Sequence, residues 1–228
     1  MKKKSLDRYF HYGKLTIRLH PEVYDPAEDT FLLIDAVKIK RNESVLEIGT
    51  GCGIIALEYA RTGANVICTD LNPYAVSLTQ ENFSINKSHI KGSFEVRKGD
   101  LFKPIKENEI FDIIIFNPPY LPTKRNEIIG GSGWFDVATN GGIDGLKFTK
   151  KFIDKLENHL KDKGSAYFVF SSLSDSKKLE TYIKKRNFYF NIISNCKFND
   201  ETISVYELKK KKRLGGIKLS LNPSACSW

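Results

Sequence analysis

The stretch that decides the fold is VLEIGTGCG, residues 45–53. Val45, Leu46 and Ile48 make a short apolar run, which predicts a buried strand. Glycines then stand at every second position, and the segment that begins at Ile54 is predicted to be a helix. Glycines between a strand and a helix let the backbone turn tightly and approach a ligand closely. The stretch therefore predicts a strand–turn–helix unit with a binding loop at the turn.

Strands and helices alternate through the rest of the chain. Asp25, Pro26 and Glu28 form a capping box that predicts a helix from residue 25 to about residue 40. The other predicted helices are 54–61, 73–86, 146–160 and 174–186, and the predicted strands are 45–48, 65–70, 94–97, 112–116, 166–170, 189–198 and 202–208. This order predicts an α/β fold with one doubly wound, Rossmann-like, mostly parallel sheet that ends in an antiparallel hairpin. The glycine-rich segment 121–144 lacks periodicity, and a loop of this length is usually functional or disordered.

Length and composition predict one soluble, cytoplasmic domain. The 228 residues can bury a substantial core, and they contain no apolar stretch long enough to cross a membrane and no secretory signal. The four cysteines form no C-x-x-C pair, which is typical of reduced thiols. We expect an N-terminal extension over 1–22, a catalytic domain over 23–208 and a basic tail over 209–228.

The net charge of +9 is concentrated near the two ends of the chain. Residues 2–4 and 209–213 hold eight of the 36 basic residues and no acid, and the remaining 28 nearly balance 27 acidic residues. Such runs are usually solvated and flexible. The sequence therefore favours solvated ends, and it restricts any contact with nucleic acid to these basic tails.

The acids around the glycine loop suggest a nucleoside ligand. The dinucleotide fingerprint G-x-G-x-x-G would need a glycine at position 54, where the chain has Ile54. Asp70 ends the next predicted strand, 21 residues after Gly49, where a carboxylate can accept bonds from both ribose hydroxyls. The plainer interpretation is that the glycines only make a turn and Asp70 only caps the following helix.

A second motif follows the apolar run IIIF at residues 113–116. The next residues are Asn117, Pro118, Pro119 and Tyr120. Prolines have no backbone N–H, so the loop offers carbonyl oxygens and the Asn117 side-chain oxygen without the usual donors. Such a group of acceptors suits a planar –NH₂ group, on which a tyrosine ring can also lie. The motif predicts a site that holds and activates a planar nitrogen by orientation and electrostatics, without a metal ion. It does not distinguish glutamine from adenine or cytosine.

Together these motifs resemble the class I methyltransferases that use S-adenosylmethionine, and in particular the compact archaeal and eukaryotic branch of the HemK-related glutamine methyltransferases. The resemblance covers about residues 20–208 and rests on segments 23–33, 47–53, 69–73, 116–120 and 140–145.

The resemblance implies a cofactor, a set of site residues and protein partners. The implied cofactor-binding residues are Thr30, Glu47, Gly49, Gly51, Gly53, Asp70, Leu71, Asp100, Leu101 and Asn117, with Asp100 at the adenine. The implied catalytic residues are Asn117, Pro118 and Tyr120, and these three bind the target amide together with Pro119. The implied substrate is the glutamine of the Gly-Gly-Gln motif in a class I release factor. The implied partner is a small zinc-binding activator subunit on the strand near 94–97, the expected sheet edge.

Two other functions fit parts of the pattern. An RNA or DNA amino-methyltransferase shares the Asn-Pro-Pro-Tyr chemistry, but it usually needs a recognition domain or a basic cleft. A non-catalytic binding subunit usually loses one of the two motifs, and both are intact here. The four histidines are scattered and predict no metal site. Residues 218–228 match no pattern of the family.

Overall fold

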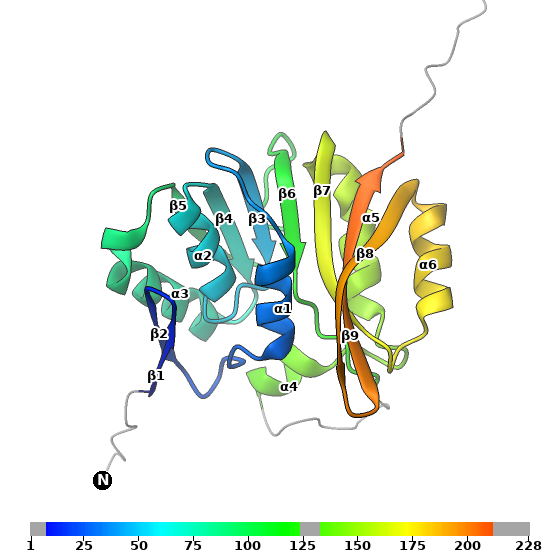
Figure 1. Cartoon of the computed structure of the whole chain (residues 1–228), viewed down its shortest axis with the longest axis horizontal. Coiled ribbons are helices and arrows are strands. Elements are labelled where there is room, and N and C mark those ends of the chain that lie inside the picture. Colours follow the sequence, from blue (N-terminus) through cyan, green and yellow to red (C-terminus); the bar gives the residue numbers. More distant parts are fainter. Residues whose placement is uncertain (1–7, 124–132, 212–228) are drawn as a thin grey trace, which may run out of the picture.

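The structure is a computed structural model that describes residues 8–123 and 133–211. A seven-stranded sheet runs through the molecule in the order β5-β4-β3-β6-β7-β9-β8 (Figure 1). Neighbouring strands from β5 to β7 are parallel, while β9 is antiparallel to both β7 and β8. The strands are β3 (Ser44–Ile48), β4 (Asn65–Asp70), β5 (Phe94–Lys98), β6 (Phe111–Phe116), β7 (Leu160–Ser171), β8 (Phe188–Phe198) and β9 (Glu201–Lys210). The predicted fold class is confirmed.

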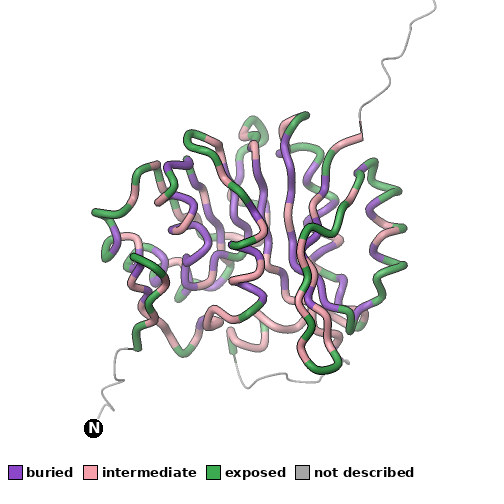
Figure 2. The backbone as a smooth tube through the Cα atoms, in the orientation of Figure 1, coloured by how far each residue is buried: buried purple, intermediate pink, exposed green. Residues whose placement is uncertain are grey.

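Helices cover both faces of the sheet because side chains of the central strands alternate between two apolar cores. Val45 and Ile113 belong to the core beneath α1, α2 and α3, whereas Leu46 and Ile114 belong to the core beneath α5 and α6. Buried positions accordingly run along the central strands (Figure 2). The helices are α1 (Glu28–Ala36), α2 (Ile54–Thr62), α3 (Pro73–Ile85), α4 (Trp134–Thr139), α5 (Lys147–His159) and α6 (Ser176–Lys185), with a 3₁₀ turn at Lys87–His89.

The first predicted helix is shorter than expected. It begins at Glu28 and ends at Ala36, rather than spanning 25 to about 40. Asp25 does not cap it, because its carboxylate pairs with Arg8. Instead the Thr30 hydroxyl accepts the backbone N–H of Ala27 at 3.3 Å. The predicted capping box is therefore wrong: the N-cap is Ala27, two residues after Asp25.

Two elements were not predicted from the sequence. Residues Arg8–Tyr12 (β1) and Leu15–Leu19 (β2) form an antiparallel hairpin that lies against α3. The hairpin is anchored by Leu15 and Ile17, which are fully buried, and by Asn82, whose side chain bonds the backbone of Arg18 in both directions. The second element is α4, within the segment predicted to be a loop.

The C-terminal strand also extends further than predicted. Lys209 and Lys210 pair with β8 and belong to β9, although the sequence suggested a tail from residue 209. Pairing with β8 fixes the backbone of both lysines, and their side chains form ion pairs with Glu207 and Asp162. Residues 1–7 and 212–228 lie outside the described residues. None of the described helices has the length and hydropathy needed to cross a lipid bilayer.

Candidate active site

The site forms where the strand order reverses. The chain runs outward from β3 to β4 and β5, and then returns to place β6 on the other side of β3. Ile48 and Phe116 are register partners at the carboxyl ends of β3 and β6. The loops that follow them, which carry the glycine motif and the Asn-Pro-Pro-Tyr motif, therefore leave the sheet side by side. Ligands in doubly wound sheets bind at such a switch point.

One cavity collects nearly all of the predicted site residues. Those in its wall are Thr30, Glu47, Gly49, Gly51, Asp70, Leu71, Asp100, Leu101, Asn117, Pro118, Pro119 and Tyr120. Gly53 is not in the wall: it precedes α2 with φ of 84°, and a Cβ on it would lie 2.7 Å from the Thr79 side chain. Gly53 thus allows α2 and α3 to pack closely behind the loop.

Asp70 is held by backbone donors from two loops. Its Oδ2 accepts the N–H of Gly51 at 2.9 Å, and its Oδ1 accepts the N–H of Asn72 at 2.8 Å. Burial raises the pKa of this carboxyl, although those backbone bonds oppose the shift. Each oxygen retains a further lone pair. The carboxylate is therefore fixed in orientation while it can still accept hydroxyl donors from the cavity.

Glu47 is a buried acid at the base of the glycine loop. Its exposed fraction is 1%, and its Oε2 accepts the Thr50 hydroxyl at 2.7 Å. Burial, reinforced by the negative charge of Asp70, raises the pKa of Glu47 to about 8. The side chain is therefore protonated at neutral pH until a cationic group, such as the ammonium of an amino acid, comes near.

This pKa predicts a pH-dependent effect of Glu47→Gln on stability. A pKa raised in the folded state favours folding most at low pH, and that contribution is lost as pH rises toward 8. We expect the free energy of unfolding of the variant to exceed that of the wild type. The difference should grow between pH 5 and pH 8, by at most about 1.4 kcal/mol per pH unit. Denaturant unfolding at pH 5, 6.5 and 8 measures this, and parallel pH profiles for the two proteins would contradict it.

The loop that carries Asp100 and Leu101 is tied to the carboxyl end of β4. Leu101 has φ of 50°, a strained value for a branched residue, and its carbonyl accepts the Thr69 hydroxyl at 3.2 Å. The Gly99 N–H donates to the Asp70 carbonyl at 2.8 Å. These bonds fix the backbone beside the cavity wall.

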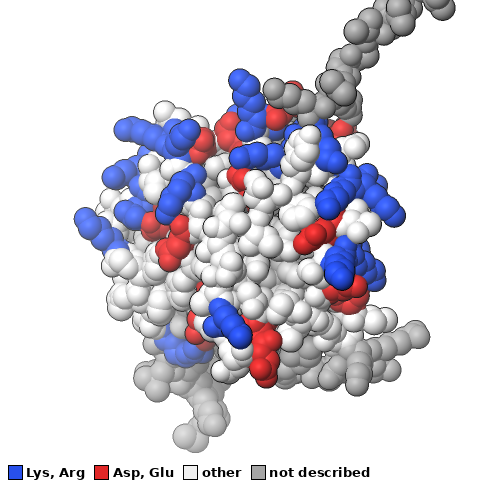
Figure 3. All heavy atoms as spheres, turned by 45° about the vertical axis from the view of Figure 1, so that its right-hand side comes forward, with Lys and Arg blue, Asp and Glu red and all other residues white. Residues whose placement is uncertain are grey.

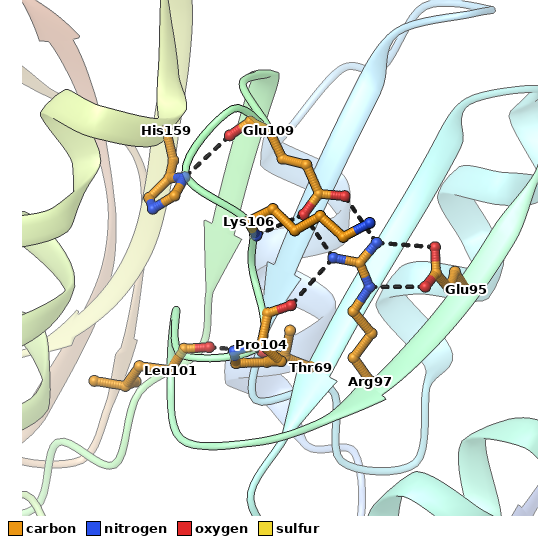
Figure 4. A network of polar contacts seen from close by, with 8 residues as sticks. All are labelled: Thr69, Glu95, Arg97, Leu101, Pro104, Lys106, Glu109 and His159. Carbon is orange, nitrogen blue, oxygen red and sulfur yellow. Dashed lines mark hydrogen bonds and ion pairs between the residues drawn. The ribbon is translucent and has the colours of Figure 1, made fainter.

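A network centred on Arg97 braces the far side of the same loop (Figure 4). Its guanidinium bonds both oxygens of Glu109 at 2.6 and 2.8 Å, and it also bonds Glu95 and the Pro104 carbonyl. The bonds from Arg97 lower the pKa of Glu109 to about 2. The His159 ring contacts the Glu109 carbonyl at 3.0 Å and so joins the network to α5.

We expect Arg97→Met to weaken cofactor binding without changing the chemical step. Loss of these bonds releases the loop that carries Asp100, so the Kd for S-adenosylmethionine should rise about tenfold, an effect of about 1.4 kcal/mol. At saturating cofactor, kcat should stay within about twofold of wild type. Calorimetric titration and initial rates measure the two quantities. Arg186→Met, which removes an exposed ion pair on α6, is the control. An unchanged Kd for Arg97→Met would contradict the prediction.

Asn117 and Tyr120 converge on a residue that was not predicted, Asp29. The Asn117 amide nitrogen and the Tyr120 hydroxyl each donate to Asp29 Oδ2 at 3.1 Å. Burial, and then the charge of Asp29, raise the pKa of Tyr120, so its hydroxyl keeps its proton. Asn117 Oδ1 is buried and has no hydrogen-bond partner among the described residues. An unmatched buried acceptor is costly unless a ligand satisfies it.

The segment 140–145 supports the Asn-Pro-Pro-Tyr loop from outside. The Gly141 N–H donates to the Leu121 carbonyl at 2.9 Å, and the Ser174 hydroxyl donates to the Tyr120 carbonyl at 3.2 Å. A Cβ on Gly141 would lie 2.7 Å from the Tyr120 carbonyl carbon. The glycines of this segment therefore allow two backbones to touch. The sequence identified the segment as a motif without indicating this contact.

The cavity wall fits S-adenosylmethionine. Carboxylates of Glu47, Asp70 and Asp100 suit an ammonium, a ribose diol and an adenine amine, while Leu71 and Leu101 offer apolar surface to a flat base. Asn117, whose buried Oδ1 is unmatched, is a residue of the same wall.

Similarity to known proteins identifies the family of this chain. Residues 15–131 match the Methyltransferase small domain. "Putative protein N5-glutamine methyltransferase MJ0928" of Methanocaldococcus jannaschii is 39% identical over 192 residues, which cover 84% of this chain and 93% of that protein. "Methyltransferase HEMK2" of Homo sapiens is 31% identical, with 83% of this chain and 90% of that protein covered.

A solved structure shares the fold. The E. cuniculi Mtq2–Trm112 complex, described as responsible for methylation of the eRF1 translation termination factor, has a chain that superposes with a TM-score of 0.64 at 24% identity. The match covers 83% of this chain and 99% of that chain. The chain belongs to the S-adenosylmethionine-dependent class I methyltransferases, and within them to the HemK-type protein glutamine methyltransferase family.

Proposed function

We propose that the protein transfers a methyl group from S-adenosylmethionine to the side-chain nitrogen of a protein glutamine, the Gly-Gly-Gln glutamine of a class I release factor. The observation that carries the proposal is the acceptor-only character of the loop after β6. Asn117 Oδ1 is an unmatched buried acceptor, and Pro118 and Pro119 contribute no N–H. Relatives named as glutamine methyltransferases support the choice of substrate.

The roles of the site residues follow from this geometry. Asn117 Oδ1 and the Pro118 carbonyl would accept the two N–H groups of the target amide, and the Tyr120 ring would lie against its plane. Holding both hydrogens fixes an otherwise poorly nucleophilic nitrogen so that its lone pair can turn toward the methyl donor. When bound, S-adenosylmethionine supplies an electrophilic methyl group on its sulfonium. One amide proton leaves to solvent after transfer, so no buried general base is required.

We assign the other residues of the cavity to the cofactor. Glu47 and Thr30 would face its methionine part, and Asp70 its ribose. Asp100 would accept its adenine amine between Leu71 and Leu101. Gly49 and Gly51 would allow close approach of the backbone, while Gly53 supports the loop from behind.

Methylation of RNA or DNA is the weaker alternative. In the view of Figure 3, Lys and Arg side chains are interspersed with Asp and Glu around a central area that has neither. This face of the molecule therefore shows no continuous basic area of the kind that a nucleic-acid enzyme uses to neutralise phosphates.

We also propose a small zinc-binding activator subunit as partner. Strand β5 ends the sheet among the described strands, as predicted, so it can pair with a strand of another chain. The E. cuniculi structure is a complex of Mtq2 with Trm112, which supports a two-subunit enzyme. If the purified chain alone is monomeric and fully active, the partner is not needed and this part of the proposal fails.

The sequence predicted a catalytic domain over 23–208, an extension over 1–22 and a basic tail over 209–228. Because Lys209 and Lys210 belong to β9, we propose that the catalytic domain runs to Lys210 and that the tail begins after it. Because the hairpin buries Leu15 and Ile17, variants should be made in a chain that retains residues 8–19. The free thiols of Cys52 and Cys68 support a cytoplasmic location.

Methyl transfer to alternative substrates tests the proposed function. The protein, with and without a small zinc-binding partner, is incubated with labelled S-adenosylmethionine and either a release factor or total RNA. We expect label on the release factor, and none on a release factor whose Gly-Gly-Gln glutamine is replaced by alanine. Label on RNA alone would overturn the proposal.

A further inference from the structure

A buried carboxylate lies directly behind the substrate-facing loop. Asp29, in the first turn of α1, is 5% exposed. Its Oδ1 accepts the backbone N–H of Thr30 at 2.6 Å and the Thr30 hydroxyl at 3.1 Å. Its Oδ2 accepts from Asn117 and Tyr120. All four of these donors are uncharged. A carboxylate that accepts on both oxygens is fixed in place, and it dictates the polarity of the groups that face it.

The chemistry of a carboxylate decides how Asn117 is oriented. An ionised carboxylate can only accept hydrogen bonds, so the Asn117 amide must turn its NH₂ toward Asp29. The other end of the amide, Oδ1, then points away from Asp29 and is left without a partner among the described residues, in a residue that lines the cavity. Rotation of the amide by half a turn would place two oxygens against each other and would present a donor to the cavity instead. Asp29 therefore selects one of the two orientations.

The same carboxylate decides the role of the Tyr120 hydroxyl. Its single proton is engaged with Asp29, so it cannot donate to a ligand in the cavity. Pro118 and Pro119 contribute no N–H, and the Tyr120 hydroxyl proton and one Asn117 amide proton are engaged with Asp29. This arrangement favours a group that brings two N–H donors.

We infer that Asp29 is a positioning residue that fixes the Asn117 amide and the Tyr120 hydroxyl, so that the site accepts a glutamine side chain and rejects the isosteric carboxylate of glutamate. The inference rests on the proposed function. It adds to that function the residue that makes the site select the substrate's amide rather than a carboxylate. A glutamate side chain would bring only acceptors to a site of acceptors, and repulsion between them would exclude it.

Asp29→Asn tests the inference with an isosteric change. An asparagine at position 29 can donate as well as accept, so the Asn117 amide loses its fixed orientation. We expect kcat on the release factor to fall about 10²-fold, while the Kd for S-adenosylmethionine changes by no more than about threefold. Asp25→Asn removes an acid from the same segment that pairs with Arg8 at the surface, and it should leave kcat unchanged. A wild-type kcat for Asp29→Asn would overturn the inference.

The selectivity for glutamine gives a readout that a purely structural role would not change. A release factor with glutamate in place of the target glutamine should not compete with the normal substrate for the wild-type enzyme. It should compete at least about tenfold better for Asp29→Asn, because a turned Asn117 offers it a donor. Equal competition in the two enzymes would contradict the inference.

An exchange of the two residues keeps the test valid if Asp29→Asn folds poorly. Asn117→Asp alone opposes two carboxylates and should be almost inactive. In Asp29→Asn/Asn117→Asp, the new asparagine donates to the new carboxylate, whose second oxygen still faces the cavity. We expect the exchange to be at least about tenfold faster than Asn117→Asp. A double variant no faster than Asn117→Asp would overturn the inference. If wild type itself does not methylate the release factor, the proposed function fails instead, and the variants are then compared on the substrate that does accept label.

Discussion

Asn117→Ala is expected to lower kcat for methylation of the release factor by about 10²- to 10³-fold. The variant removes the side-chain acceptor that holds the target amide, and it leaves Asp29 with one donor fewer. The groups that we assign to ribose and adenine stay in place, so the Kd for S-adenosylmethionine should change by less than about fivefold. Single-turnover transfer of labelled methyl and a calorimetric titration of the cofactor measure the two effects.

The control for this variant is Asn195→Ala. Asn195 is exposed on β8 and does not line the cavity, so its loss should change neither quantity. A near-normal kcat for Asn117→Ala would show that the side-chain acceptor is not part of the chemistry. A lost kcat together with a lost cofactor affinity would show that Asn117 acts through the cofactor and not through the target amide.

Gly145→Ala is expected to destabilise the fold by about 3 kcal/mol and to abolish most activity. The position has φ of 67°, and a Cβ there would lie 2.5 Å from the Tyr120 carbonyl oxygen and 1.9 Å from Ser174 Oγ. Ser174 can rotate away, but the carbonyl is part of the substrate-facing loop. The segment 140–145 must therefore move, and the loop must move with it.

Gly13→Ala is the matched control for the effect of φ. Gly13 also has a positive φ, of 55°, but a Cβ on it would meet nothing within 4 Å. The substitution should lower the free energy of unfolding by only about 1 kcal/mol, because alanine is disfavoured in the left-handed backbone region. Denaturant unfolding of both variants separates the contact from the backbone conformation. Equal losses of stability would show that the contact with Tyr120 contributes nothing.

The central sheet could be predicted because its signals are local. β3 and β6 are mostly apolar, because central strands are buried on both faces. Gly49 marks the end of β3, and Asn117 and Pro118 mark the end of β6. The β1–β2 hairpin carries no comparable signal. Its strands, RYFHY and LTIRL, are short and mix charged with apolar residues, and they gain their burial from contact with helices that are distant in the sequence, chiefly α3.

The site could be predicted in part. Glu47, Asp70 and Asn117 stand in motifs whose chemistry is readable along the chain. Asp29 could not be assigned in the same way, because its partners Asn117 and Tyr120 lie 88 and 91 residues further on. The only local signal is an acid beside Thr30 in a segment whose other inward residues are apolar. Arg97 was missed for a related reason, since an arginine in an edge strand is usually solvated.

The most direct test of the central claim is mass spectrometry of the release factor after incubation with the enzyme, S-adenosylmethionine and the activator. The account predicts one added methyl group on the side-chain nitrogen of the Gly-Gly-Gln glutamine with the wild-type enzyme. It predicts almost none with Asn117→Ala or with Asp29→Asn over the same interval. Methylation at a different residue, or equal yields from the three enzymes, would contradict an acceptor-only loop that selects a glutamine amide.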